Sequence, residues 1–324
     1  MSGKTRIGIF GAGAMARKHL EAYRGIKFAQ VVGVCSARPE RLKKIAADFG
    51  TRAFADREAM LAEIDAADIC LPTFMHEDAA RAAAGAGVHA ICEKPIALDT
   101  RAAKRMINSA GRSNTILMIA HCLRFWPEYT ILRAAVTRGS FGKPLSFHAW
   151  RFGSLPAYSS RNWLLDEKKS GGPAVDLQIH DADMAFFLFG KPAAVRATEI
   201  NSKLVRSVNS EYIYTGGPAV SVSAGWFFPK TYPFSMGYRA VFETAVIEYE
   251  SSRTPRVTIH RPGKTPLHPN LQPTDAYREE LLYFANCVRF SSEPSVSPAQ
   301  DALSALRMVL AARKSAASGR AVRL

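Results

Sequence analysis

Residues 6–16 read RIGIFGAGAMA, an apolar strand pattern that continues through a glycine turn into an alanine-rich helix pattern. In this G-x-G-x-x-A arrangement Gly11 allows a sharp turn, Gly13 lets the backbone approach a pyrophosphate, and Ala16 keeps the helix close to the strand. The free amides and the positive dipole end of the helix then form an anion site. The stretch predicts a dinucleotide site, although other tight turns between a strand and a helix also use glycines.

The same alternation of short apolar runs and amphipathic, alanine-rich stretches continues to about residue 122. It is typical of βαβ units built around a parallel sheet. Strands are expected at 6–10, 31–35, 68–71, 90–93 and 116–121, and helices at 14–24, 39–49, 57–63, 77–86 and 100–110.

The pattern changes after residue 122, where several strand patterns follow one another without helices between them. Such a succession predicts a mainly antiparallel open sheet, so the second half is expected to be α+β. Strands are expected at 145–152, 194–200, 219–228, 235–243, 245–250 and 256–260, and helices at 127–138, 275–290 and 300–315.

The chain has 324 residues, of which 48% are hydrophobic and 22% charged. Because single cores stop growing at roughly 250 to 300 residues, we expect two domains. The predicted fold class is α/β, with a Rossmann dinucleotide-binding domain at 1–122 and an α+β substrate-binding domain at 123–324. The C-terminal tail could pack back on the first domain.

Lys and Arg number 43 against 28 Asp and Glu, which leaves a net charge of +15. The basic residues are scattered and do not form one block, so solubility and a mildly basic site explain them better than a nucleic-acid partner. The five cysteines are odd in number and mostly lie in apolar runs, which indicates reduced thiols. Without a long apolar segment or a signal-peptide pattern, we expect a cytoplasmic protein with no membrane partner.

The second strand pattern is followed by Ser36 and Arg38, roughly 20 residues after the glycine turn. An NAD site usually has Asp or Glu at this place, for the ribose hydroxyls, and no acid is there. A hydroxyl and a guanidinium suit a 2′-phosphate, so NADP(H) is favoured over NAD(H). Alternatively, Arg38 is an ordinary solvated charge at a helix start.

Three segments together resemble the Gfo/Idh/MocA family of glucose-fructose oxidoreductase and inositol dehydrogenase relatives. They are GAGAMA at 11–16, CEKPIALD at 92–99 and GGPAVDLQIHDADMAFFLFG at 171–190, and the likeness also includes the FGKP turn at 141–144. The resemblance implies a Rossmann domain followed by an α+β domain whose sheet forms the interface of a homodimer or homotetramer. It also implies reversible hydride transfer between a nicotinamide cofactor and a hydroxyl of a sugar, cyclitol or related polyol.

Lys94, Asp176 and His180 match positions that are catalytic in this family. Lys94 follows a predicted parallel strand, at the sheet edge where such folds bind ligands, and can stabilise a developing alkoxide. Asp176 and His180 are four residues apart and would share one face of a helix, where His180 has a suitable pKa for proton transfer. Asp183 is a further candidate partner, and no metal is expected. The resemblance also suggests a cis bond before Pro95.

Further candidates surround these residues. For the cofactor they are Gly11, Gly13, Ala14, Met15, Ser36, Arg38, Leu71, Pro72, Thr73, His76, Glu93 and Lys94. His76 matches a family histidine near the cofactor; alternatively, it is a helix cap. For the substrate they are Lys94, Asp176 and His180 with Arg124, Phe125, Trp126, Arg151, Tyr158, Arg161, Asn162 and Trp163. Alternatively, the aromatic and basic residues from Arg124 onward belong to the core or to an interface.

Two other functions remain open. A glycoside-cleaving enzyme could use tightly bound NAD to oxidise and then re-reduce a sugar. A non-catalytic cofactor-responsive binding protein could share the fold, because fold does not determine function. The presence of Lys94, Asp176 and His180 favours the oxidoreductase.

Overall fold

The computed structural model describes residues 4–156, 160–227 and 229–324. The chain divides into two compact units, one formed by residues 1–125 and 274–303 and the other by residues 126–273 and 304–324. Helix α11 (Ala299–Ser318) contributes residues to both units. The first unit therefore includes a returning C-terminal segment in addition to the N-terminal region.

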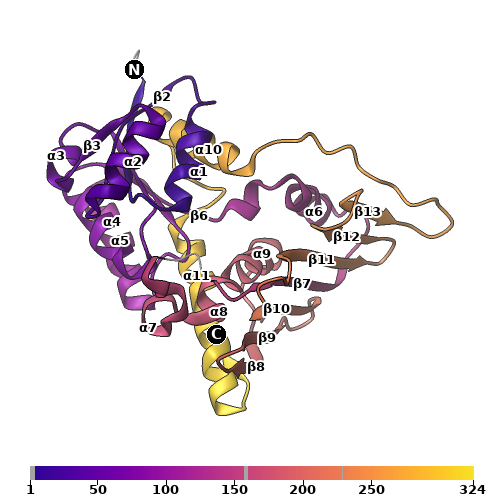
Figure 1. Cartoon of the computed structure of the whole chain (residues 1–324). Coiled ribbons are helices and arrows are strands. Elements are labelled where there is room, and N and C mark those ends of the chain that lie inside the picture. The colour runs from indigo at the N-terminus through magenta and orange to yellow at the C-terminus, as the bar shows by residue number, and fades with distance from the viewer. Residues whose placement is uncertain (1–3, 157–159, 228) are drawn as a thin grey trace. The chain divides into compact units, whose positions relative to one another are not determined.

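The first unit contains a parallel six-stranded sheet with the order β3-β2-β1-β4-β5-β6. Figure 1 labels β2, β3 and β6 of this sheet. The strand order reverses between β1 and β4, which is the place where open sheets of this kind bind ligands. The predicted Rossmann architecture is thus confirmed. Its elements are β1 (Thr5–Phe10), α1 (Ala14–Tyr23), β2 (Ala29–Cys35), α2 (Pro39–Phe49), β3 (Arg52–Phe54), α3 (Arg57–Leu61), β4 (Ala66–Ile69), the 3-10 helix η1 (Thr73–Met75), α4 (His76–Gly85), β5 (His89–Glu93), α5 (Thr100–Arg112), β6 (Leu117–Ala120), the 3-10 helix η2 (Cys122–Phe125) and α10 (Ala276–Phe290).

Apolar strands form the core of the first unit, because both faces of a parallel sheet are covered by helices. Ile7 and Ile9 on β1 and Ile91 on β5 are fully buried. Helix α10 packs against α1 and brings Leu281 and Phe284 into the same core. The returning segment is therefore part of the structure that supports the glycine turn.

The second unit contains an eight-stranded sheet with the order β13-β12-β11-β7-β10-β9-β8-β14. Among the described strands of this sheet, β7 and β10 are the only pair that runs in parallel, so the predicted mainly antiparallel sheet is confirmed. Helices α8 and α9 pack on its central strands. Its elements are α6 (Pro127–Arg138), β7 (Pro144–Ser154), the 3-10 helix η3 (Ser160–Leu165), α7 (Glu167–Ser170), α8 (Gly172–Asp176), α9 (Ile179–Phe189), β8 (Ala194–Asn201), β9 (Val205–Ile213), β10 (Ala219–Phe227), β11 (Ser235–Phe242), β12 (Val246–Glu250), β13 (Val257–His260) and β14 (Val322–Arg323).

Buried tyrosines anchor α6 to this sheet. The ring centroids of Tyr129 and Tyr238 lie 5.2 Å apart, and those of Tyr129 and Tyr249 lie 5.5 Å apart. The hydroxyl of Tyr238 donates a hydrogen bond of 2.5 Å to the carbonyl oxygen of Glu128. These contacts combine a large apolar area with a satisfied polar group.

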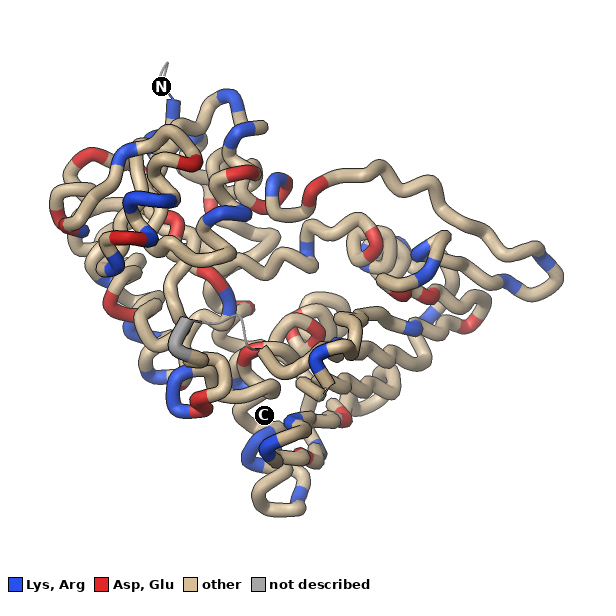
Figure 2. Tube along the Cα trace, in the orientation of Figure 1, with Lys and Arg blue, Asp and Glu red and all other residues tan. Residues whose placement is uncertain are grey.

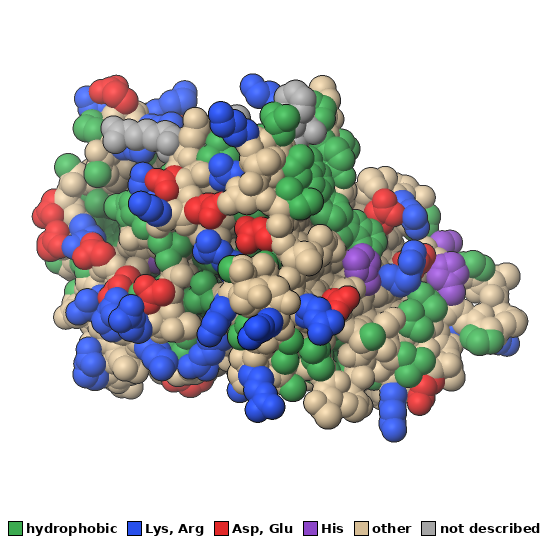
Figure 3. Space-filling view, turned by 90° about the horizontal axis from the view of Figure 1, so that it is seen from below, with side chains coloured by type: hydrophobic (Ala, Val, Ile, Leu, Met, Phe, Trp, Pro, Cys, Tyr) green, Lys and Arg blue, Asp and Glu red, His purple; other side chains and the backbone are tan. Residues whose placement is uncertain are grey.

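The charged residues are distributed over both units (Figure 2). Several are neutralised locally, as in the ion pair of Arg105 with Glu77 at 2.6 Å. On the face drawn in Figure 3, Lys and Arg groups are interrupted by acidic, apolar and neutral side chains. Among the described residues, no helix has both the length and the apolar character required to cross a lipid bilayer.

Candidate active site

The glycine turn joins β1 to α1 at the carboxyl edge of the parallel sheet. Gly11 has a φ of +118°, and a Cβ there would lie 2.4 Å from the carbonyl oxygen of Cys70. The amide of Gly11 also donates to the carbonyl oxygen of Cys35 at 2.8 Å. The turn is thus held between the ends of β2 and β4, and only glycine fits at this position.

Gly13 is in a different environment. It is the N-cap residue of α1 with an ordinary φ of −95°, and a Cβ there would point into open space, with no described atom within 4 Å apart from those of its own stretch of chain. No described side chain caps this helix end, and its first turn contains no acidic residue. The amides of Ala14 and Met15 belong to this first turn. These features fit the approach of a pyrophosphate.

The end of β2 carries the predicted ribose-side residues. Ser36 and Arg38 are both half-buried, and the hydroxyl of Ser36 accepts a hydrogen bond of 3.3 Å from the amide of Arg38. Arg38 is the N-cap residue of α2, where the chain is extended. A hydroxyl and a guanidinium thus lie at the carboxyl end of the strand next to β1.

His76, the first residue of α4, is buried and links two segments at this edge. Its Nε2 lies 2.8 Å from the carbonyl oxygen of Leu71, and its Nδ1 lies 2.9 Å from the carbonyl oxygen of Pro95. Burial lowers the pKa of His76, although the two carbonyl groups oppose the shift. The histidine joins the extension of β4, which includes Pro72 and Thr73, to the turn after β5.

Glu93, Lys94 and Pro95 form this turn at the carboxyl end of β5. The Lys94–Pro95 peptide bond is cis. Oε2 of the buried Glu93 accepts a hydrogen bond of 3.1 Å from the amide of Lys94, whose side chain is half-buried. Burial would raise the pKa of Glu93, but the close contact with His19 at 3.2 Å and the positive charges nearby hold it below its ordinary value.

Sequence reasoning missed a group of buried polar residues behind this turn. His19 on α1, Asp68 on β4 and Cys70 just after β4 contact one another and are buried. A charged residue in an otherwise apolar strand, as in the sequence AADI, was the available signal for Asp68.

The second unit holds Asp176 and His180, and here one prediction is wrong. The two residues do not lie on one continuous helix, because Asp176 ends α8 and His180 is in the first turn of α9. Between them the amide of Gln178 bonds to the carbonyl oxygen of Pro173 at 2.8 Å, five residues back. Such a bond widens the turn and interrupts the regular helix.

The side chain of Gln178 explains the interruption. It is fully buried and accepts a hydrogen bond of 2.9 Å from Ser210, while its Nε2 donates to the carbonyl oxygen of Val222 at 3.0 Å. These bonds tie the junction of α8 and α9 to β9 and β10. The position of Asp176 relative to His180 therefore depends on the sheet as well as on helix geometry.

Two family models match the chain. One, described as an oxidoreductase family with an NAD-binding Rossmann fold, matches residues 5–121, and the other, the GFO/IDH/MocA C-terminal domain, matches residues 129–248. The chain belongs to the Gfo/Idh/MocA oxidoreductase family. The resemblance of its three sequence segments is thus confirmed.

UDP-N-acetylglucosamine 3-dehydrogenase of Acidithiobacillus ferrooxidans is 36% identical over 60% of this chain and 58% of its own length, which is less than two thirds of that enzyme. Its solved structure has a TM-score of 0.83 at 26% identity, covering 97% of this chain and 98% of that one. D-Apiose dehydrogenase of Paraburkholderia graminis is 28% identical over 98% of this chain and 88% of its own length. Levoglucosan dehydrogenase, solved with NADH and levoglucosan, shares the fold with a TM-score of 0.87 at 22% identity, covering 99% of each chain.

Two buried arginines that were candidates for substrate binding in this Gfo/Idh/MocA chain form ion pairs, one with the partly exposed Asp301 and one with the buried Asp181. Arg124 donates to Asp301 at 2.8 Å and to the carbonyl oxygen of Val296 at 2.7 Å. Arg151 donates to Asp181 at 3.0 Å, and burial raises the pKa of Asp181 despite this partner. These contacts favour structural roles for both arginines.

The remaining substrate candidates differ in their surroundings. Trp126 is the N-cap residue of α6 and Trp163 belongs to η3, and both are half-buried. Tyr158 and the side chain of Arg161 lie outside the described residues. Asp183 on α9 is fully buried.

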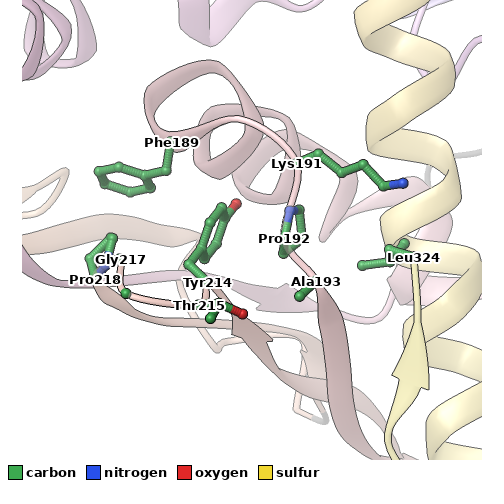
Figure 4. Close-up of a pocket in the computed structure, with 10 residues that line it drawn as sticks. Phe189, Lys191, Pro192, Ala193, Tyr214, Thr215, Gly217, Pro218 and Leu324 are labelled. Carbon is green, nitrogen blue, oxygen red and sulfur yellow. The ribbon is translucent and has the colours of Figure 1, made fainter.

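A surface hollow of about 530 Å³ lies in the second unit, near the start of β8 and the end of the chain (Figure 4). Lys191, Tyr214 and Leu324 are among its lining residues. Its lining includes none of the predicted site residues of the described chain. The hollow is therefore distinct from the candidate active-site residues.

Proposed function

We propose that this protein is an NAD(P)-dependent oxidoreductase that transfers hydride between nicotinamide and a hydroxyl or keto group of a sugar, cyclitol or related polyol. One observation carries the proposal. The glycine turn, the Leu71–Thr73 segment and Lys94 follow β1, β4 and β5, which are neighbours in one parallel sheet. The features suited to a dinucleotide thus share one sheet edge with a basic group suited to an alkoxide.

The bound nicotinamide would supply or accept the hydride. The open amides after Gly13 would hold the pyrophosphate. Lys94 would donate a hydrogen bond to the reacting oxygen and stabilise its developing charge. His180 would accept the alcohol proton in oxidation and return it in reduction, and Asp176 would orient the imidazole or bind a neighbouring hydroxyl.

Relatives support this substrate class. The names of the two curated relatives state a nucleotide sugar and a pentose as their substrates. Both are polyhydroxylated compounds with secondary alcohols. We infer the same class for this chain, without a preference for one sugar.

We also propose that NADP(H) is preferred over NAD(H). Ser36 offers a hydroxyl and Arg38 offers a permanent cation directly after β2. In this fold the residues at the end of that strand bind the ribose of the cofactor. No carboxylate occurs at 36–38 to bind two ribose hydroxyls and repel a phosphate.

The family resemblance further supports a homodimer or homotetramer formed through the sheet of the second unit. Large apolar side chains are exposed on its strands, including Leu145 on β7, Ile200 on β8 and Ile213 on β9. Burial of such side chains is a common driving force for association. Light scattering coupled to size exclusion would give the mass of the assembly, and a monomer would refute this proposal.

The function is tested by incubating the purified chain with NADP+ or NAD+ and UDP-N-acetylglucosamine, D-apiose or myo-inositol, and in the reverse direction with keto sugars and NADPH or NADH. We expect a sustained change in the nicotinamide absorbance with at least one of these substrates. Cleavage of a glycoside without a net absorbance change would instead indicate the hydrolase. Tight cofactor binding without turnover on any substrate would indicate the sensor.

A further inference from the structure

A fully buried imidazole links three secondary-structure elements of the first unit. His19 on α1 has no exposed surface, and its Nδ1 lies 3.0 and 2.9 Å from the two carboxylate oxygens of Asp68 on β4. Its Nε2 lies 3.2 Å from Oε1 of Glu93 at the end of β5. Both ring nitrogens therefore face carboxylates.

This arrangement determines the protonation of the ring. A neutral imidazole has one N–H, and only the imidazolium donates from both nitrogens. Although burial favours the neutral form, the charge of Asp68 and the hydrogen bonds raise the pKa of His19 well above its ordinary value. One positive charge is thus shared by two buried carboxylates.

The second oxygen of Glu93 continues the connection. It accepts the amide hydrogen of Lys94 at 3.1 Å. A chain of polar contacts therefore leads from Asp68 through His19 and Glu93 to the peptide that carries the Lys94 side chain, with an ion-pair contact between His19 and Glu93 as its middle link. On the other side of the same turn, His76 contacts the carbonyl oxygen of Pro95.

We propose that His19 is a positioning residue that fixes the peptide carrying Lys94 by bridging Asp68 and Glu93. The inference rests on the role proposed above for Lys94. A lysine that stabilises an alkoxide must be held close to its productive geometry, because small displacements weaken the transition-state contact. His19 would act through Glu93 and would not itself touch the substrate or the cofactor.

Other polar groups face His19 from each neighbouring element. Sγ of Cys70 lies 3.3 Å from Nδ1 of His19 and 3.3 Å from Oδ1 of Asp68, and burial raises the pKa of this thiol. The ring of Tyr277 on α10 is tilted against His19 with the centroids 6.2 Å apart. Tyr23 on α1 and Glu280 on α10 are further buried ionisable groups, and burial together with the charge of Asp68 raises the pKa of Tyr23.

His19, Asp68 and Cys70 are also residue types that bind metals. Their donor atoms, however, contact one another at hydrogen-bond distances, with Nδ1 of His19 against both oxygens of Asp68. Metal ligands would instead direct these atoms toward a common ion. The contacts therefore support a hydrogen-bonded bridge.

The test compares His19→Gln with His89→Gln. His89 lies at the other end of β5, where its Nδ1 accepts a hydrogen bond of 3.0 Å from the amide of Ile116, so this control also loses a histidine and a hydrogen bond. Hydrogen exchange at the Lys94 amide gives a readout that needs no substrate. In His19→Gln we expect exchange at least about tenfold faster and turnover at least about tenfold lower, with cofactor affinity nearly unchanged. His89→Gln should keep the wild-type values at this amide.

A second variant, Asp68→Asn, covers the case in which His19→Gln does not fold. Because the charge of Asp68 opposes the lowering effect of burial on the pKa of His19, removing this charge should lower that pKa. Because the imidazolium is the bridging form, the turnover of Asp68→Asn divided by that of the wild type should then fall as the pH rises above neutral. Taking the ratio removes the titration of groups that both proteins share, such as His180.

Two results would overturn the proposal. In the first, His19→Gln and His89→Gln exchange alike at the Lys94 amide. In the second, His19→Gln loses turnover while this amide keeps its protection, so that the histidine acts by another route. A failure of the proposed function is distinguishable, because it would appear as near-native turnover of Lys94→Ala, whereas the exchange comparison does not depend on turnover.

Discussion

Replacing the two glycines of the β1–α1 turn by alanine, one at a time, is expected to affect two different properties. Gly11→Ala should lower stability, and Gly13→Ala should lower cofactor affinity. In Gly11→Ala the new methyl group would lie 2.4 Å from the backbone oxygen of Cys70 at a φ of +118°. In Gly13→Ala it would enter open space at an ordinary φ of −95°. The first change disturbs the fold, and the second places an atom where a pyrophosphate would approach.

The magnitudes follow from these geometries. Strain at such a φ costs about 1 to 3 kcal/mol, and the overlap with a backbone atom costs a similar amount, so Gly11→Ala should lower the free energy of unfolding by about 2 to 6 kcal/mol. Gly13→Ala should change it by no more than about 1 kcal/mol, since alanine tolerates this conformation but is a weaker N-cap residue than glycine. Its affinity for NADPH should nevertheless fall by about tenfold or more, which corresponds to about 1.4 kcal/mol.

Urea unfolding and a fluorescence titration with NADPH at one fixed salt concentration measure the two effects on the same preparations. Wild-type affinity in Gly13→Ala would refute the placement of the pyrophosphate at this turn. Unchanged stability in Gly11→Ala would refute the close contact with Cys70.

Three further predictions concern single side chains. Arg38→Ala should weaken NADPH binding by about tenfold or more, with NADH affinity changed by less than about twofold, in parallel fluorescence titrations; equal losses would make Arg38 an ordinary surface charge. Arg124→Met should lower the free energy of unfolding in urea by about 1 to 3 kcal/mol, because it removes the donor to the partly exposed Asp301 and to the carbonyl oxygen of Val296; a raised KM with unchanged stability would favour substrate binding instead. The fold holds His76 with a lowered pKa, so the unfolded chain takes up a proton on this histidine before the folded chain does. Wild-type stability should therefore decline as the pH falls below about 6.5, and unfolding of His76→Gln should show a weaker decline over the same range.

Local patterns made much of the fold predictable. Helix α2 has the predicted range of Pro39–Phe49, because Pro39 occupies its first turn and Gly50 ends it with a φ of 64°. The predicted strands of the first unit were found because their apolar runs are bounded by turn residues. The missed strands lack this signal. Strand β3 has only three residues, and β9 reads VRSVNSEYI, in which polar residues interrupt the apolar ones.

The candidate site was predictable only where it is local in sequence. The glycine turn and the Glu93–Lys94–Pro95 segment were found because the residues of each motif are consecutive in the sequence and form one turn after a strand. The break between Asp176 and His180 could not be read from their spacing, since it depends on bonds from Gln178 to the sheet. The contacts of His19 were equally hidden, because they join three elements that only the folded sheet brings together.

Turnover and NADPH affinity, measured together for the wild type, Lys94→Ala and His180→Ala with a substrate found in the polyol screen, test the central claim most directly. We expect each substitution to lower turnover by about 100-fold to 10,000-fold, the range expected for a group that acts on the reacting oxygen or its proton. Cofactor affinity should stay within about threefold of the wild type, because neither side chain is assigned to the pyrophosphate or the ribose. Near-native turnover in either variant would show that the substituted residue takes no part in the reaction.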